Sequence, residues 1–400
     1  MSAPLLAYEL LTTAEEVVGY LDGAGLLPHL AERAHDVAVS EVTAGNMNRV
    51  FIASGPLGSL AIKQAPPFVQ VAGPGWPIDP ARIGAEARAY EVFSRIVPEA
   101  VPVVVHCDLE RFVLVMEDLS GLRVLRDELI DQIRAAASGN PARAIDFDRL
   151  GAVVGRFVGT VSAATSLTRL GADAHAELVR TSANAELCAL TLDVVLDEPF
   201  RAHEHNHWHP ALAPRVANLY GDEEVGRAVA GLRATFRDSA QSLLHGDLHS
   251  GSIMVEPAQV AALRTDAPEQ QIRVFDPEFS FVGPIGLDLG LFWANLEIAA
   301  VAAEAVGAHG LAAERRGAID SSWAAFTAEW RSEGVDENWL DSVRADAWRF
   351  AGAEAMRRVV GYSHAADLET LPPEVSAAAH QTIFDRARHW LVAGTPRESL

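Results

Sequence analysis

Two short segments of the chain bring carboxylates and histidines close together. The first, His245 to Val255, begins with His-Gly-Asp and places Asp247 before a strand-like run; the second contains Asp276 and Glu278, which alternate at a strand end. Phosphoryl transfer needs one carboxylate to orient and deprotonate an attacking hydroxyl, and further carboxylates to hold Mg²⁺ against phosphates. Either segment alone is also compatible with an ordinary polar turn, but the two together with an upstream lysine favour a phosphoryl-transfer site.

That lysine is Lys63, the single lysine among 32 basic side chains. A lone lysine is ordinarily a solvated surface charge, but this one ends a strand after a tight turn, where its ammonium can reach phosphates. The preceding loop, 43–51, offers backbone N–H groups to cover those phosphates, although its only glycine is Gly45. Glu86 is the leading candidate to pair with Lys63, and Glu91 is the alternative because helix phase from sequence is uncertain by a few residues.

The elements around Lys63 predict a small, β-rich lobe. A cap-like Thr12–Glu16 start predicts a helical segment that extends to about Asp36. A helix is also predicted at 82–96. Strand-like runs lie at 37–42, 50–53, 59–63, 101–106 and 112–116, and the turn at 55–58 joins two of them into a hairpin.

The rest of the chain predicts a larger and mainly helical lobe. Apolar residues recur at helical spacing in 143–165, 223–244, 287–307, 311–332, 339–362 and 373–392, with extended pieces at 251–255 and 271–276. We therefore predict an α+β fold with an N-lobe at 1–116, a hinge at 117–121 and a C-lobe at 122–400, and a cleft between the lobes as the default ligand site.

Composition restricts the partners. A formal net charge of -22 argues against nucleic acid and anionic membranes, so an anionic ligand must be held by local positive charge. Two cysteines, Cys107 and Cys188, are too few for a disulfide framework, and the N-terminal residues lack the layout of a signal peptide. A cytoplasmic location is expected. The apolar run 291–308 contains three polar residues and predicts a buried amphipathic helix, not a membrane span.

The hairpin lysine, the Met-Glu-Asp-Leu run at 116–119, His-Gly-Asp and Asp-Pro-Glu together resemble the aminoglycoside phosphotransferase-like branch of the protein-kinase-like fold. Within that branch the chain is most similar to the S-methyl-5-thioribose kinase family of methionine salvage. His-Gly-Asp is specific to the superfamily only, whereas Gly-Ser-Ile-Met, Asp-Pro-Glu-Phe and a pair of arginines are specific to this family. Matching segments cover nearly the whole chain in the family's order: 45–48, 62–65, 75–77, 81–83, 115–120, 184–188, 245–254, 276–279, 283–284, 350–352 and 357–358.

The resemblance implies a two-lobed kinase that uses ATP and Mg²⁺ to phosphorylate the anomeric hydroxyl of a small sugar, and it implies a homodimer. Asp247 would be the catalytic base, Asp276 and Glu278 would bind magnesium, and Lys63 would contact the ATP phosphates. The other implied nucleotide contacts are Gly45, Asn46, Asn48 and Glu86 around the phosphates and backbone groups of Met116, Glu117 and Leu119 at adenine. The implied substrate contacts are Arg357, Arg358 and Trp76, together with Asp247.

One short run and two single residues differ from what related kinases have. Gly73-Pro74-Gly75 precedes Trp76 where this family typically has a polar Gly-Glu-Ser, and Val282 replaces an aromatic residue. Both changes fall near the sugar pocket that the resemblance implies, so they leave the nucleotide chemistry intact and bear on the identity of the sugar. Ser252 stands where many superfamily members have a metal-binding asparagine, and here the chain matches the methylthioribose kinases.

Three functions are therefore compared. A 5-methylthioribose kinase is preferred over a paralogous kinase for another small sugar, such as 5-deoxyribose, or for an antibiotic. A pseudokinase that acts as a binding module is disfavoured, because Lys63, Asp247, Asp276 and Glu278 are all present.

Three polar clusters can be interpreted from their local sequence alone. Arg315 and Arg316 predict a solvated helix face. Arg357 and Arg358 lie in a mostly small and apolar run, so at least one of their guanidinium groups should face a buried partner. The histidines in 203–209 alternate in a way that zinc binding could use, but their spacing is irregular for a closed site, and a solvated loop is favoured.

Overall fold

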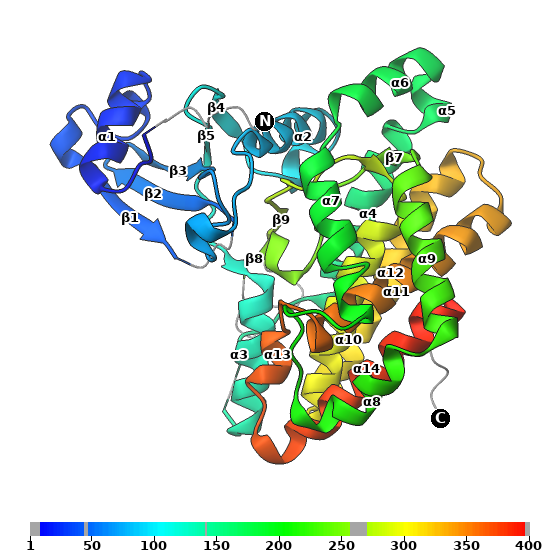
Figure 1. The fold of residues 1–400 in the computed structure, drawn as a ribbon. Coiled ribbons are helices and arrows are strands. Elements are labelled where there is room, and N and C mark those ends of the chain that lie inside the picture. Colours follow the sequence, from blue (N-terminus) through cyan, green and yellow to red (C-terminus); the bar gives the residue numbers. More distant parts are fainter. Residues whose placement is uncertain (1–8, 44–46, 141, 257–269, 397–400) are drawn as a thin grey trace. The chain divides into compact units, whose positions relative to one another are not determined.

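The computed structural model describes residues 9–43, 47–140, 142–256 and 270–396, and the chain divides into two compact units, Met1–Gly121 and Leu122–Leu400 (Figure 1). The predicted nucleotide contacts Gly45 and Asn46 lie outside the described residues. The first unit contains a five-stranded sheet and the second is mainly helical. The predicted α+β composition is therefore confirmed.

The first unit is built on an antiparallel sheet of order β1-β2-β3-β5-β4. Its strands are β1 (Ala38–Val42), β2 (Arg49–Gly55), β3 (Gly58–Gln64), β4 (Val104–Asp108) and β5 (Val113–Glu117). The predicted hairpin is confirmed, since Gly55 pairs with Gly58 across the turn. A side chain at Gly55 would collide with the backbone oxygen of Leu30, which explains the glycine there.

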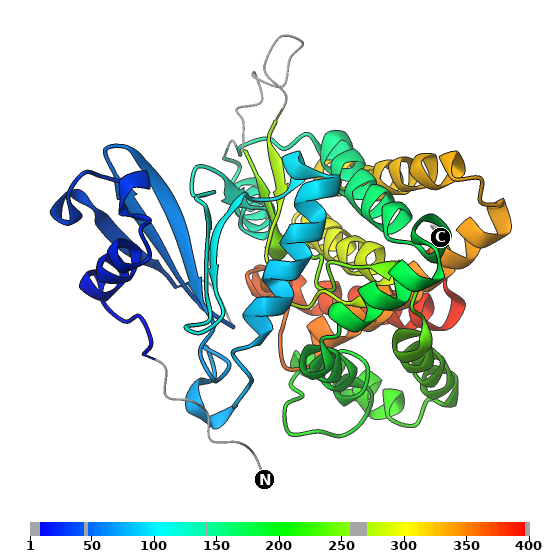
Figure 2. The ribbon, with the colours of Figure 1, turned by 90° about the horizontal axis from the view of Figure 1, so that it is seen from above.

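Two helices accompany this sheet. Helix α1 (Ala14–Gly23) begins with the expected capping box, in which Thr13 and Glu16 bond each other's backbone N–H groups. It ends well before Asp36, because Gly25 has a positive φ of 73° and only single 3₁₀ turns follow, so the longer predicted helical segment is wrong. Helix α2 (Arg82–Ile96) matches its prediction and packs against β4 and β5 (Figure 2).

Alternation along β3 places Lys63 on one particular face of the sheet. Leu60 and Ile62 belong to the apolar cluster that includes Val17 and Leu21 of α1. Successive strand residues point to opposite faces, so Lys63 lies on the face away from that cluster. The strand period therefore accounts for a charged side chain in a strand that is otherwise largely buried.

The second unit has a helical core and two small sheets, β6-β8-β9 and β7-β10. The strands are β6 (Arg123–Val124), β7 (Ser242–Leu243), β8 (Ile253–Val255), β9 (Ile272–Val274) and β10 (Val282–Gly283). The helices are α3 (Leu125–Ala137), α4 (Phe147–Ala164), α5 (Leu167–Leu170), α6 (Ala172–Thr181), α7 (Ala185–Val194), α8 (Ala213–Leu219), α9 (Glu223–Asp238), α10 (Gly286–Ala305), α11 (His309–Ser332), α12 (Glu337–Val360), α13 (Ala366–Glu369) and α14 (Pro373–Ala393). The helix predicted at 223–244 is too long, because the chain leaves α9 at Asp238 and enters β7.

Helix α10 is the centre of this unit. Helices α11, α12 and α14 pack around it, and its residues from Gly286 to Ala303 are buried at almost every position. The predicted burial of this helix is confirmed. The predicted amphipathic character is wrong, since no broad face of the helix meets solvent. Among the described residues, α10 is the one helix whose length and composition would allow it to cross a membrane, and 94% of that stretch is buried inside the protein.

Arg315 is not on a solvated face, which corrects the prediction for this pair. Its side chain is fully buried in α11 and donates to the backbone oxygens of Leu129 (2.9 Å) and Ala299 and to Oε1 of Gln132 (3.1 Å). Burial lowers the pKa of Arg315 to about 10. Arg316 is half-buried and pairs with glutamates of α10. The pair therefore ties α11 to α3 and α10, a role that depends on neighbours distant in sequence.

Candidate active site

The loop between β7 and β8, which carries His-Gly-Asp, is clamped by a carboxylate of α10. Asp288 accepts hydrogen bonds from the backbone N–H groups of His245 (2.7 Å) and Gly246 (2.9 Å). Burial raises the pKa of Asp288 to about 7, although the two amide donors oppose that rise. Gly246 has φ 86°, and a Cβ there would lie 2.2 Å from the backbone oxygen of Phe279. The glycine is thus required by both conformation and space.

His245 joins this loop to the segment that carries the other two carboxylates. It is buried, its Nε2 bonds the backbone oxygen of Phe275 (2.9 Å), and its Nδ1 accepts from the backbone N–H of Asp247 (3.3 Å). Burial lowers the pKa of His245 to about 4. A neutral imidazole with its proton on Nε2 satisfies both contacts, so His245 positions two chain segments.

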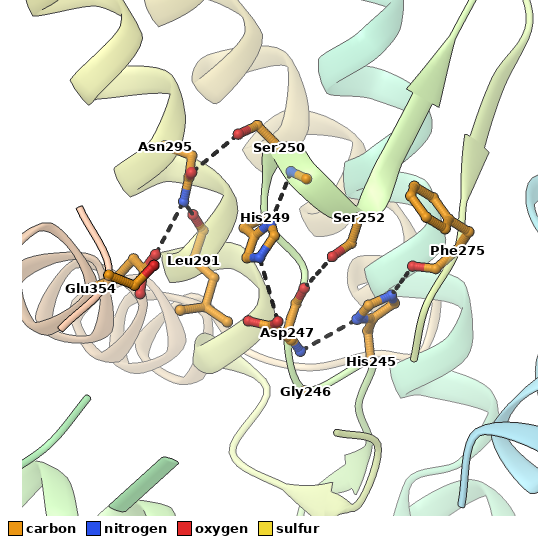
Figure 3. A network of polar contacts seen from close by, with 12 residues as sticks. His245, Gly246, Asp247, His249, Ser250, Ser252, Phe275, Leu291, Asn295 and Glu354 are labelled. Carbon is orange, nitrogen blue, oxygen red and sulfur yellow. Dashed lines mark hydrogen bonds and ion pairs between the residues drawn. The ribbon is translucent and has the colours of Figure 1, made fainter. Parts of the chain in front are cut away.

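Asp247 faces a second histidine of the same loop (Figure 3). Nδ1 of His249 accepts from the backbone N–H of Gly251 (2.8 Å), which leaves the proton on Nε2, 3.4 Å from Oδ2 of Asp247. About a quarter of the Asp247 side chain is exposed, at 28%. Burial alone would raise the pKa of Asp247, but the interaction with His249 and the positive charges of Arg357 and Arg358 outweigh it and hold that pKa well below its usual value. The carboxylate is therefore ionised and accessible.

Ser252, at the position of the asparagine in many superfamily members, supports the loop through its side chain. Its Oγ donates to the backbone oxygen of Asp247 (2.8 Å), and its own backbone oxygen accepts from the N–H of Phe275 (3.0 Å). The hydroxyl is nearly inaccessible, with the residue 3% exposed. This contact fixes the backbone that carries Asp247.

The two predicted magnesium ligands lie at the end of β9. Carboxylate oxygens of Asp276 and Glu278 are within 4.8 Å of each other. Asp276 has φ 66°, a left-handed conformation that is uncommon outside glycine and recurs at functional sites. Asn184 holds the following backbone by donating to the oxygens of Glu278 (2.8 Å) and Ser280 (3.1 Å). Two oxygen donors at this separation suit a single hard cation.

The arginine pair of α12 is held by a glutamate one turn earlier. Glu354 is fully buried, and it accepts hydrogen bonds from Nε of Arg357 and from Nε of Arg358 (2.7 Å). Burial would raise the pKa of Glu354, but the charges of Arg357 and Arg358 lower it to about 2. The prediction that at least one guanidinium faces a buried partner is confirmed, and here both do.

A chain of hydrogen bonds connects this pair to the Asp247 loop (Figure 3). Oγ of Ser250 donates to Oδ1 of Asn295 (3.1 Å), and Nδ2 of Asn295 donates to Oε1 of Glu354 (3.4 Å). The loop and the two arginines are therefore positioned by one network through α10 and α12.

A third arginine reaches the same region from α3. Nη1 of Arg126 lies close to Gly251: a Cβ added to this glycine would be 3.0 Å from that nitrogen. Burial lowers the pKa of Arg126, and nearby Arg358 lowers it further, while Asp127, Asp367 and Asp247 oppose the shift. This part of the chain thus gathers cationic side chains around Asp247, despite the acidic composition of the whole protein.

In the first unit, Lys63 pairs with Glu86 and not with Glu91. Nζ of Lys63 lies 2.6 Å from Oε2 of Glu86, and both side chains are buried. Glu91 instead pairs with Arg95 on the outer surface of α2. The pair confirms the preferred partner of Lys63 and fixes the direction of its ammonium.

Arg82 organises the loops next to this pair. It donates to the backbone oxygen of Met47 (2.8 Å), to Oδ1 of Asn48 (3.0 Å) and to the backbone oxygen of Pro66 (2.9 Å). Asn48 is buried by these contacts, with the residue 5% exposed. The loop that follows β1 is therefore anchored at Asn48.

The other predicted contacts of the first unit occupy two segments. Met116 is buried at the end of β5, and the N–H of Glu117 donates to the backbone oxygen of Val103 (2.8 Å). Leu119 follows in the segment that leads out of the sheet. Trp76 ends the short turn Gly73–Gly75 and bonds back through its backbone oxygen to the N–H of Val69 (2.9 Å). The nucleotide and substrate roles of these residues stay predictions.

Comparison with known proteins identifies the family. No protein-family model matches the chain. The methylthioribose kinases of Bacillus thuringiensis (strain Al Hakam) and Bacillus anthracis are each 34% identical to it over 357 residues, which cover 85% of this chain and 83% of the relative. The chain belongs to the methylthioribose kinase family. It is accordingly a phosphotransferase.

A solved structure described as "the microcompartment-associated aminopropanol kinase" superposes with a TM-score of 0.52 at 11% identity, covering 94% of this chain and 99% of that one. At this identity the likeness concerns the fold alone. It confirms the protein-kinase-like fold predicted for this member of the methylthioribose kinase family.

The sequence patterns missed several residues that position the site. Glu354 precedes Arg357 and Arg358 by three and four residues, the helical spacing of ion pairs, so this partner was detectable. Asp288 and Asn295 carry no such local signal, because their partners lie more than 40 residues away in the chain. Only the packing of α10 against the loop brings them there.

Proposed function

We propose that the chain is an ATP-dependent kinase that transfers the γ-phosphoryl group to the anomeric hydroxyl of 5-methylthioribose, as the name of its relatives indicates. One observation carries this proposal: Asp247 faces His249 in a network that also holds Arg357 and Arg358. An ionised carboxylate beside fixed cations suits a hydroxyl nucleophile that attacks an anionic phosphate.

In this proposal Asp247 accepts a hydrogen bond from the anomeric hydroxyl and orients its oxygen toward the γ-phosphorus. The new O–P bond forms as the bond from phosphorus to the β–γ bridging oxygen breaks, and ADP leaves with that electron pair. The low pKa of Asp247 makes it a weak base, so it takes the hydroxyl proton late, when bond formation has made that proton acidic. Arg357 and Arg358 stabilise charge on the transferring group.

Mg²⁺ would be held by Asp276 and Glu278, whose closely spaced oxygens fit a hard cation that prefers carboxylate ligands. The ion neutralises phosphate charge when it is bound. Lys63, directed by Glu86, would contact the phosphates. The N–H of Glu117 is engaged by Val103, so adenine would use other backbone groups of 116–119.

Another small sugar is the alternative to 5-methylthioribose as the substrate. Val282 pairs with Leu243 in the two-stranded sheet that leads directly into the Asp247 loop, and it replaces the family's aromatic residue. This exchange and the Gly73-Pro74-Gly75 run before Trp76 leave the sugar open, and another small sugar such as 5-deoxyribose is the second candidate. The homodimer and the place in methionine salvage that the resemblance implies, and the cytoplasmic location expected from the composition, are part of the proposal.

A substrate panel tests these assignments. Purified protein with ATP and Mg²⁺ is assayed for ADP release with methylthioribose, 5-deoxyribose, ribose and an aminoglycoside, and the phosphorylated position is determined by ³¹P NMR. We expect the highest kcat/KM with methylthioribose and a 1-phosphate product. A higher kcat/KM with the aminoglycoside, or phosphorylation at another hydroxyl, would refute the proposed substrate.

A further inference from the structure

A histidine-rich segment of the second unit has no part in the network described above. Histidines alternate at 203, 205, 207 and 209, in the chain between the short turns Glu198–Phe200 and Pro210–Leu212. The sequence favoured a solvated loop. The structure differs, because the carboxylate of Glu198 lies beside two of these rings and is itself buried, with 9% of its side chain exposed.

The three side chains converge on one point. Oε2 of Glu198 lies 3.0 Å from Nδ1 of His205 and 3.6 Å from Nδ1 of His203. One ligand atom from each residue lies within 4.8 Å of the other two. Nδ1 of His203 accepts a long hydrogen bond from the N–H of His205 (3.3 Å), so this nitrogen is unprotonated, and a metal ion would replace that hydrogen bond.

The backbone that presents these groups is tied to the rest of the unit. Nδ2 of Asn206 donates to the backbone oxygens of Glu198 (2.6 Å) and Arg201 (2.9 Å) and to the hydroxyl of Tyr220 (3.2 Å). The ring of His205 packs edge-on against Tyr362, with ring centroids 5.6 Å apart. The ligand positions are therefore preorganised by contacts outside the cluster.

We propose that Glu198, His203 and His205 bind one Zn²⁺ ion. Zn–N and Zn–O bonds of about 2.0–2.1 Å in a tetrahedron separate neighbouring ligand atoms by about 3.3 Å, close to the separations from Oε2 of Glu198. Two imidazoles and a carboxylate favour zinc over magnesium, which prefers oxygen ligands. The histidine side chains are 21% and 32% exposed, so water can fill the fourth position.

The other two histidines of the segment provide a matched control. His207 stacks on His364 with ring centroids 3.9 Å apart, and His209 stacks on His380 at 4.9 Å. Glu369 lies 2.8 Å from His364 and 3.5 Å from His380. His207 and His209 therefore pack on a different set of side chains from the proposed zinc ligands. Removing His207 and His209 deletes as many imidazoles as removing His203 and His205 but leaves the proposed ligands intact.

The experiment uses the full-length protein without a polyhistidine tag. Zn²⁺ is titrated in competition with a chromogenic chelator. Excess Mg²⁺ is present so that zinc does not bind at Asp276 and Glu278, the proposed magnesium ligands. Bound zinc is also measured after gel filtration. We expect one Zn²⁺ per chain, with affinity reduced by at least about 10–100-fold in the double variant His203→Gln/His205→Gln. The His207→Gln/His209→Gln variant should bind like the wild type.

Two results would overturn the proposal: no stoichiometric zinc in the wild-type protein, or equal loss of zinc in both double variants. Circular dichroism of each variant shows whether it is folded. The Glu198→Gln variant with Co²⁺ provides a second readout, because a three-ligand site including the carboxylate gives a visible d–d spectrum that this variant should change. A spectrum unaffected by Glu198→Gln would exclude the carboxylate as a ligand.

Discussion

Replacing Glu354 with glutamine removes a buried negative charge that holds two arginines. The carboxylate is fully buried and bonds Nε of both Arg357 and Arg358. Breaking a buried ion pair from one side destabilises a protein by about 3–5 kcal/mol, and the lower end applies here because glutamine keeps one acceptor oxygen. We therefore expect Glu354→Gln to lower the free energy of unfolding by about 3 kcal/mol at pH 7.

The pH dependence gives a sharper test. The folded pKa of Glu354 is about 2, below the ordinary value of 4.5, so its stabilising effect is complete well above pH 4.5 and is lost as pH falls toward 2. Integrating proton binding between these values shows that about 1 kcal/mol is lost between pH 7 and pH 4. The stability gap between the wild type and Glu354→Gln should narrow from about 3 to about 2 kcal/mol over that range.

Urea unfolding followed by tryptophan fluorescence measures this gap. All tryptophans except Trp76 lie in Leu122–Leu400, so the signal reports the unit that contains Glu354. Glu314→Gln, at an exposed position of α11, is the control and should change stability little at either pH. A gap below about 1 kcal/mol at pH 7, or one that does not narrow at pH 4, would refute the reasoning.

Three further variants test other contacts. Asp247→Ala should reduce kcat by about 10²–10⁴-fold while ATP binding, measured by calorimetry, is retained; unchanged turnover would show that Asp247 is not the base. Lys63→Arg should lower kcat/KM for ATP by about tenfold or more, because a broad guanidinium replaces a compact ammonium 2.6 Å from Glu86; activity within about twofold would contradict this. Arg315→Met should destabilise the protein by about 3 kcal/mol in urea unfolding, since it leaves buried oxygens unpaired; a loss under about 1 kcal/mol would show that they find other partners.

Local patterns predicted much of the fold. The hairpin of β2 and β3, the helix that carries Glu86 and most long helices of the second unit lie where apolar periodicity placed them. Two errors concerned the point at which a helix ends. Gly25 stops the N-terminal helical segment, and the chain turns into β7 after α9 although its residues there are compatible with a longer helix.

The prediction for the partner of one charged residue succeeded. Glu86 was the preferred partner of Lys63, and the structure brings them together. The prediction for Arg315 was wrong, because a polar residue in a helix is expected to be exposed unless its distant neighbours are known. Glu198 shows the same limit, since nothing in its local sequence marks it as a companion of His203 and His205.

The amino-acid sequence alone establishes which chemistry is available: the carboxylates of His-Gly-Asp and Asp-Pro-Glu, a single lysine on a strand and a pair of arginines on a helix. How these groups are held and charged depends on packing between distant segments. Asp288 clamps the Asp247 loop and Glu354 orients both arginines because α10 and α12 bury them beside their partners. Burial strengthens electrostatic interactions and removes competing water, and burial depends on contacts between segments far apart in the chain.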